Sequence, residues 1–216
     1  MERTFIKDLR SVIGQTVTLQ GWLQTLRDQK KIQFIILRDP TGMAQVAHWK
    51  PNNEALAEDI AKLGTETALT ITGKVIDNPV VKLNGLEIQL ESLVVENSAD
   101  IPLPFDPFAE TLPTIDYRLD WRYMDLRRPI NHLFFEVETT VEMAMREYWV
   151  KNHFLEVHSP KLTGSPSESG AELFSLDYFE RKAYLAQSPQ FYKQMAMAAG
   201  FERIFEIGPV FRADPS

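Results

Sequence analysis

Residues 17–24 read Val17-Thr18-Leu19-Gln20-Gly21-Trp22-Leu23-Gln24, and this stretch decides the first half of the fold. Val17, Leu19, Gly21 and Leu23 alternate with Thr18, Gln20, Trp22 and Gln24, which are the polar face of the pattern. A period of two residues is typical of a β-strand that is buried on one side. The stretch therefore predicts a strand with one face in a core.

Four further β-rich runs follow, at residues 32–37, 43–49, 69–76 and 86–95. Between the second and third of these five strands, Pro40 and Gly42 supply turn chemistry. A short helix is expected over 51–63 and can end at Gly64. Five strands with a helix between the third and fourth are the order of an OB-fold barrel, which suits oligonucleotides. We predict such a domain over residues 1–96.

The stretch 97–128 is expected to be a linker or hinge, because Pro102, Pro104, Pro107 and Pro113 fall close together. A second domain is expected over 129–216, so the whole chain belongs to the α+β class. It begins with a helix, since Pro129 fits a first helical turn and apolar residues recur at helical spacing as far as about residue 152. The pattern then predicts a short strand at 154–160, a helix at 190–199 and a strand at 202–212.

Composition excludes several kinds of protein. Hydrophobic residues make up 44% and charged residues 25% of the 216, as in an ordinary globular protein. No apolar run approaches the roughly 20 residues that span a bilayer, and the charged start is unlike a signal peptide, so we expect a cytoplasmic protein with no membrane partner. There is no cysteine, and the four histidines show no metal-ligand spacing, so no metal site is expected among these residues.

Charge is unevenly distributed along the chain. The net charge is −7, but residues 1–50 hold 8 Lys and Arg against 4 Asp and Glu, a net of +4. Three of these cations, Arg27, Lys30 and Lys31, come just before Phe34. If Phe34 points out of the barrel, it can stack on a nucleobase while the cations meet phosphates. The alternative is that Phe34 is a core residue, as most strand phenylalanines are.

The second domain carries three candidate groups. Gln190 and Lys193 are three residues apart, so they share a helical face and can hold a small carboxylate-bearing substrate. Glu168, in a Ser- and Gly-containing loop, can receive an ammonium group. Arg212 and Asp214 would project from one face at the far end of the 202–212 strand, where a guanidinium can clamp a phosphate oxygen. In isolation each also has an ordinary interpretation: an exposed helix face, a solvated loop acid and a surface ion pair.

Taken in order, these segments resemble the class II aminoacyl-tRNA synthetases and, within them, the aspartyl-tRNA synthetases. The helix from Pro129 and the strand ending at Pro160 are similar to the family's motif 1, which forms its dimer. The other matching segments, in chain order, are residues 21–22, 34–39, 42–45, 119–129, 167–174, 187–193 and 205–214, the last being the first half of motif 2. Together they cover essentially the whole chain.

The resemblance implies an enzyme, an ATP-dependent aspartate–tRNA ligase whose partners are tRNA, aspartate, ATP and a second copy of the chain. Arg212 would hold the α-phosphate of ATP and be the catalytic residue. Substrate-binding roles fall on Glu168 for the α-ammonium, Gln190 for the bound amino acid or adenylate, Lys193 for the side-chain carboxylate, and Asp214 near the adenine. Anticodon contacts fall on Arg27, Phe34, Gln45 and Glu87.

The chain departs from the family's pattern in three ways. Lys30 and Lys31 replace a usual glycine at the first hairpin turn, and Asp214 replaces a usual glutamate. The sequence also ends at Ser216, before the second half of motif 2, the residues expected to hold Mg²⁺, and motif 3. We therefore expect a piece of a longer synthetase that is inactive alone, for aspartate tRNA or for both aspartate and asparagine tRNA. The alternative is a non-catalytic relative that binds tRNA or other single-stranded nucleic acid.

Overall fold

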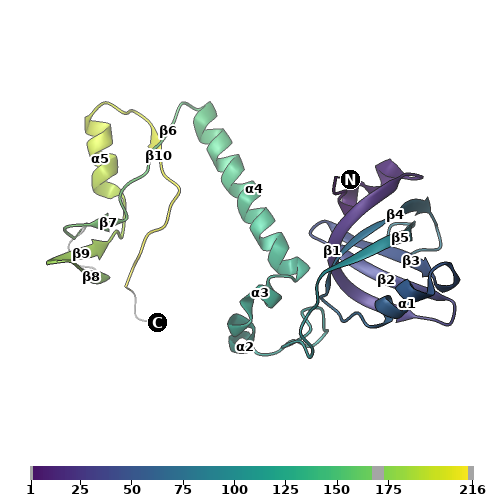
Figure 1. Cartoon of the computed structure of the whole chain (residues 1–216). Helices are drawn as coiled ribbons and strands as arrows, with labels where there is room; N and C mark the ends of the chain where they lie inside the picture. The colour runs from purple at the N-terminus through teal and green to yellow at the C-terminus, as the bar shows by residue number, and fades with distance from the viewer. Residues whose placement is uncertain (1, 167–172, 214–216) are drawn as a thin grey trace. The chain divides into compact units, whose positions relative to one another are not determined.

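The computed structural model describes residues 2–166 and 173–213, which form two compact units, Met1–Asp106 and Pro107–Ser216 (Figure 1). The first contains the barrel predicted from the sequence, and the second contains the long helix and two small sheets. No helix within the described residues is both long and apolar enough to cross a membrane.

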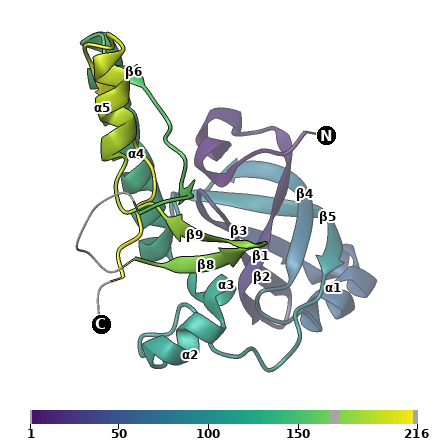
Figure 2. The same cartoon turned by 90° about the vertical axis from the view of Figure 1, so that its left-hand side faces the viewer.

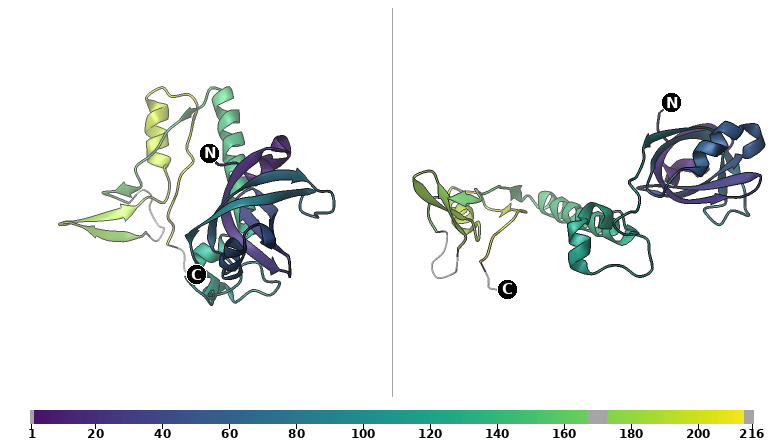
Figure 3. Two further views of the ribbon diagram at one scale, coloured as in Figure 1. Left: turned by 45° about the vertical axis from the view of Figure 1, so that its right-hand side comes forward. Right: turned by 60° about the horizontal axis from the view of Figure 1, so that its bottom comes forward.

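Five strands of the first unit close into a barrel (Figure 3). Their order around the barrel is β1-β2-β3-β5-β4. All neighbours are antiparallel except β3 and β5, which are parallel. The helix α1 lies between β3 and β4, so the predicted OB-fold order is confirmed. The bounds are β1 Thr16–Asp28, β2 Ile32–Asp39, β3 Gly42–Trp49, α1 Glu54–Ala61, β4 Ala68–Asp77 and β5 Leu86–Asn97, with 3-10 turns η1 Ile6–Val12 and η2 Lys50–Asn52.

Alternation along the strands fills the barrel, as the sequence predicts. Val17, Leu19 and Leu23 of β1 are all buried, and they belong to one apolar core with inward residues of the other strands. Gly21 lies on the same strand where β2 crosses closely: a Cβ there would come 2.2 Å from the backbone oxygen of Arg38. Only glycine leaves room for that approach of the two strands.

The second unit begins with helices α2 Ile115–Asp120, α3 Arg122–Asp125 and α4 Pro129–Lys151. Its short strands form an antiparallel sheet, β7-β9-β8, in which β8 and β9 make a hairpin (Figure 2), and a parallel pair, β10-β6. The bounds are β6 Leu155–Glu156, β7 Leu162–Thr163, β8 Ser175–Tyr178, β9 Arg181–Leu185, α5 Gln190–Ala198 and β10 Ile204–Phe205.

The predicted strand over 202–212 is much shorter in the structure, where β10 covers only Ile204–Phe205. Its partner β6 also ends after two residues, and Pro209 has no N–H to donate to a ladder. Further on, the N–H of Phe211 donates to the oxygen of Ala186 instead. Arg212 therefore does not project from a strand face, and the strand geometry predicted for Arg212 is wrong.

Helix α4 has no buried residue within its unit, although the tilted ring contact of Trp149 with Phe205 joins its last turns to β10. Large apolar and aromatic side chains are exposed along its whole length. They are Ile130, Leu133, Phe134, Phe135, Val137, Val141, Met143, Met145, Tyr148 and Val150. Such an extended apolar surface on a helix is typical of an interface with another polypeptide.

Replacing Gly21 by alanine should destabilise the barrel by about 1–3 kcal/mol, because its Cβ would overlap backbone that can move only if β1 and β2 separate. Gly164→Ala is the matched control, since a Cβ there meets nothing within 4 Å. Urea unfolding followed by circular dichroism measures both variants. Equal midpoints for Gly21→Ala and the unmodified chain would contradict the close approach.

Candidate functional site

Four outward-facing residues of the barrel come together on one side. Strand pairing sets Arg27 of β1 opposite Phe34 of β2, and Gln45 of β3 opposite Glu87 of β5. All four line one hollow of about 420 Å³. The other residues that line it are Ile36, Asn78, Val80, Val81, Lys82 and Leu83. The structure therefore brings together the four residues predicted for anticodon contact.

Phe34 is a surface residue of the barrel, since its neighbour Ile35 points into the core and Phe34 itself is only half-buried. The guanidinium carbon of Arg27 lies 5.6 Å from the centre of the Phe34 ring, within cation–π range. The Phe34 ring thus lies beneath the Arg27 guanidinium and lines the hollow. That arrangement can take a flat, electron-rich group such as a nucleobase.

A chain of hydrogen bonds orients the polar groups of this hollow. Arg27 Nη2 donates to Gln45 Oε1 at 3.2 Å, and Gln45 Nε2 donates to Glu87 Oε2 at 2.8 Å. Both the oxygen and the nitrogen of the Gln45 amide are therefore hydrogen-bonded. This orients the amide, with its oxygen toward Arg27 of β1 and its nitrogen toward Glu87 of β5. Donors and acceptors at set positions can distinguish one base edge from another.

The loop between β4 and β5 supplies residues of the hollow that the sequence analysis missed. Val80 is 89% exposed, and Val81 and Leu83 line the hollow beside it. The sequence feature that could have indicated these residues is the pair of adjacent valines, Val80 and Val81, in a turn-rich loop. Exposed apolar side chains in a loop often mark a binding surface.

In the second unit, Gln190 and Lys193 lie on the first turns of α5, and Lys193 is half-buried while Gln190 is exposed. The backbone N–H of Gln190 donates to Ser188 Oγ, in the preceding turn, at 3.1 Å. The hydrogen bond from Phe211 N to Ala186 O, 3.0 Å, brings the segment before Arg212 to that same turn. Arg212 itself is exposed.

Glu168 and Asp214 lie outside the described residues, so the structure gives no position for either. Within residues 2–166 and 173–213, no group of three His, Cys, Asp or Glu side chains could hold a metal ion.

A polar cluster around the buried carboxylate of Glu206 joins the segments after β6 and β10, and no local sequence pattern indicated it. Glu206 Oε1 accepts from Lys161 Nζ at 2.5 Å and from Ser159 Oγ at 2.9 Å, and the Glu206 side chain is only 3% exposed. Burial alone would raise the pKa of Glu206, but these hydrogen bonds and the charge of Lys161 hold the pKa below its ordinary value. Lys161 also accepts a hydrogen bond from Ala186 N at its backbone oxygen, so one residue ties three segments.

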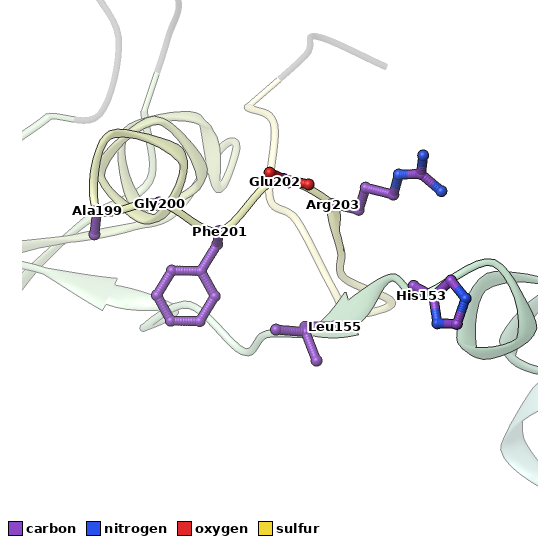
Figure 4. Close-up of a pocket in the computed structure, with 7 residues that line it drawn as sticks. All are labelled: His153, Leu155, Ala199, Gly200, Phe201, Glu202 and Arg203. Carbon is purple, nitrogen blue, oxygen red and sulfur yellow. The ribbon is translucent and has the colours of Figure 1, made fainter.

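A second hollow, of about 560 Å³, lies where α4 ends and where α5 leads into β10 (Figure 4). It is lined by His153, Leu155, Ala199, Gly200, Phe201, Glu202 and Arg203. Figure 4 shows the Phe201 ring beside Leu155. Arg203 Nη1 donates to the backbone oxygen of Asn152 at 2.9 Å, which ties the two sides together. Its described lining includes none of the predicted site residues.

Comparison with known proteins matches the two parts of the chain to two families. Residues 17–96 match the OB-fold nucleic acid binding domain, and residues 114–216 match the class II tRNA synthetases (D, K and N). The aspartate–tRNA(Asp) ligase of Picrophilus torridus is 42% identical over 212 residues, which are 98% of this chain and 49% of that protein. The aspartate–tRNA(Asp/Asn) ligase of Archaeoglobus fulgidus is 41% identical over 214 residues, 98% of this chain and 50% of that protein.

A solved structure agrees over the full length of the chain. The asparaginyl-tRNA synthetase of Pyrococcus horikoshii, complexed with asparaginyl-adenylate, has a TM-score of 0.90 and 32% sequence identity, covering 100% of this chain and 49% of that one. The chain thus spans about half the length of the relatives it matches.

The lowered pKa of Glu206 predicts a dependence of stability on pH. A carboxyl whose folded pKa lies below its unfolded value adds stability above the unfolded value, near pH 4, and this is lost as pH falls through the folded pKa. Glu206→Gln should therefore be less stable than the unmodified chain at pH 7. Below about pH 4, its free energy of unfolding should fall less as the pH is lowered. The measurement is the denaturation midpoint of the unmodified chain and of Glu206→Gln at pH values from about 2 to 7. Parallel plots of midpoint against pH would contradict the assignment.

Proposed function

The chain belongs to the class II tRNA synthetases, and on that premise we propose that it carries the anticodon-binding domain and the first catalytic elements of an aspartate–tRNA ligase. The observation that carries the proposal is the single hollow lined by Arg27, Phe34, Gln45 and Glu87. An OB-fold barrel with an aromatic platform, an oriented amide and a cation on one face suits three or so unstacked bases of an RNA loop.

In this proposal Phe34 stacks on one anticodon base and Arg27, which already lies over its ring, contacts the adjoining phosphate. Gln45 and Glu87, joined by their 2.8 Å hydrogen bond, read the edge of a base. Stacking supplies affinity for any base, whereas the amide and carboxylate supply the preference among bases.

The second unit would activate the amino acid. An oxygen of the aspartate α-carboxylate attacks the α-phosphorus of ATP, the bond to the bridging oxygen breaks, and pyrophosphate leaves with that oxygen's electrons. A terminal ribose hydroxyl of tRNA then attacks the aspartyl carbonyl, its proton is lost, and AMP leaves. The protein's task in both steps is to position groups and to stabilise charge.

Arg212 is proposed to hold the α-phosphate and Gln190 the bound amino acid or adenylate, with Glu168 at the α-ammonium and Asp214 near the adenine. The contact of Phe211 with the turn before α5 supports this, since it brings the two segments together. Mg²⁺ would accompany ATP, and no cluster of three His, Cys, Asp or Glu side chains among the described residues could hold it.

Lys193 is proposed to receive the side-chain carboxylate of aspartate. Lys193 is half-buried on the first turns of α5, and the neutral amide of asparagine would leave its ammonium group unpaired. Sites with unsatisfied charged donors discriminate strongly against such substrates. Whether the tRNA partner is that of aspartate alone or also that of asparagine depends on the barrel hollow rather than on Lys193.

We further propose that a second copy of the chain covers the exposed apolar side chains of α4, with β6 at the same interface, and that the enzyme works in the cytoplasm. A second candidate function is tRNA binding without catalysis. It is favoured by one observation: the four residues proposed for anticodon contact all line one hollow of the barrel.

Phe34→Ala should weaken tRNA binding by about 1–3 kcal/mol, the usual contribution of one stacked base. Filter binding of the chain to an aspartate tRNA transcript measures it. Phe179→Ala is the control, because Phe179 is an exposed phenylalanine outside the hollow. Equal losses in the two variants would contradict the stacking role.

Lys193→Met, made in the full-length protein, should reduce aspartate-dependent ATP–pyrophosphate exchange by about a hundred- to a thousandfold and leave tRNA binding unchanged. The control is Lys182→Met, which removes an exposed lysine paired with Asp177 on the neighbouring strand. Exchange at the unmodified rate in Lys193→Met would remove the carboxylate-receiving role, and loss in both variants would point to general instability.

A further inference from the structure

Three arginines surround one buried carboxylate where α2, α3 and α4 meet. Arg118 Nη1 lies 3.0 Å from Asp125 Oδ1, Arg122 Nη1 lies 2.5 Å from Oδ2, and Arg128 Nη1 lies 3.5 Å from Oδ1. The Asp125 side chain is 1% exposed, and Asn131 Nδ2 donates to it at 3.0 Å. Burial would raise the pKa of Asp125, but the hydrogen bonds and charges of these neighbours lower it, so the carboxylate stays ionised.

The cluster formed by Arg118, Arg122, Arg128 and Asp125 therefore carries three positive charges against one negative charge. Each guanidinium has five N–H groups, and Asp125 takes up only part of them. The Arg122 side chain is 45% exposed, against 19% for Arg118 and 23% for Arg128, so solvent reaches Arg122 more than the other two arginines. The surplus charge is thus available at the surface rather than confined to the interior.

Two further carboxylates, Asp116 and Asp120, are near in sequence and are both exposed on α2. They are four residues apart and so share one side of the helix, while Arg118 is two residues from each. Positions two apart on a helix do not face each other. The acids and the arginine cluster therefore lie on different sides of α2, and the arginine side keeps its positive charge.

The net charge of the cluster is positive, whereas that of the surrounding sequence is negative, since residues 106–216 hold 12 Lys and Arg against 17 Asp and Glu. A polyanion would be repelled by most of this unit and attracted only where guanidiniums are in excess. Phosphodiester oxygens match a planar guanidinium in geometry and charge. Tyr123, exposed next to Arg122 in the chain, adds an aromatic surface of the kind found in RNA-binding sites.

We propose that the cluster of Arg118, Arg122 and Arg128 around Asp125 is a second RNA contact of this chain and binds a phosphate of the tRNA backbone. This rests on the proposed function, because it assumes that the partner is tRNA, and it adds a contact in the unit that does not contain the barrel. Asp125 is a positioning residue in it: the buried carboxylate holds three guanidiniums at fixed places, so little side-chain freedom is lost when a phosphate binds.

The test measures binding of the 216-residue chain to aspartate tRNA as salt is varied. Each phosphate contact contributes close to one to the slope of log affinity against log salt concentration. Arg122→Gln should lower the magnitude of that slope by about one and weaken binding by roughly two- to tenfold near 0.1 M salt. Asp125 keeps Arg118, Arg128 and Asn131 in this variant, so the fold is retained.

Arg146→Gln is the matched control. It removes the same charge from the same unit, but Arg146 is paired with two carboxylates, Glu142 at 2.9 Å and Glu156 at 3.3 Å, so it has no surplus charge to offer. Its slope should equal that of the unmodified chain. Equal changes in both arginine variants would show a general effect of net charge and overturn the proposal.

A second variant leaves the network around Asp125 intact. Leu126 follows Arg122 by four residues and is exposed, so Leu126→Glu places a carboxylate beside Arg122 without removing a partner. It should also weaken tRNA binding and lower the slope. Unchanged slopes in both Arg122→Gln and Leu126→Glu would overturn the proposal.

Comparing tRNA binding by Phe34→Ala and by Arg122→Gln distinguishes the arginine contact from the anticodon site of the barrel. If Phe34→Ala weakens tRNA binding while Arg122→Gln does not, the barrel site stands and the arginine contact fails; if the unmodified chain binds no tRNA, both fail. Calorimetry with inorganic pyrophosphate tests the other source of phosphate. Arg122-dependent binding of pyrophosphate would assign the cluster to a small anion and overturn its assignment to RNA.

Discussion

The barrel depends on one short parallel pairing, that of β3 with β5, which closes the sheet. Val46 pairs with Ile88, and both are buried in the core, while the adjoining pair, Gln45 and Glu87, faces outward into the hollow. Core packing and the candidate recognition surface are therefore set by the same register. A slip of one residue would turn the polar pair inward and the apolar pair outward, so the burial of Val46 and Ile88 fixes the position of the recognition groups.

The second unit is organised differently, because its strands are short and supply few ladder hydrogen bonds. Polar contacts between distant segments replace them: Lys161 joins Glu206, and Ala186 bonds to both Lys161 and Phe211. Asp125 has the same role among the helices, where it holds α2, α3 and the start of α4. The carboxylates of Glu206 and Asp125 are both buried, so each is stable only with its partners in place.

The two units also divide the proposed work by chemistry. The barrel offers a stacking surface and an oriented amide, which suit neutral, flat bases. The second unit offers cations on helices and turns, Lys193, Arg212 and the arginine cluster, which suit carboxylates and phosphates. The overall negative charge of the chain makes such cations informative, since each stands against a background that repels an anion.

Local sequence patterns were enough to predict the barrel, its helix and the long helix α4, because strand and helix periodicities are local. The core of the barrel follows the strand alternation. The sequence also pointed to Arg27, Phe34, Gln45 and Glu87, through a resemblance to known synthetases. Tertiary structure decided that Phe34 faces out, that Val80 joins the hollow, and that the segment leading to Arg212 leaves the strand after Phe205. Lys161 and Glu206 are 45 residues apart, and no local pattern encodes a pairing across that distance. Alternation shows which side of a strand is apolar, but only the packed chain shows where the strand's partner ends.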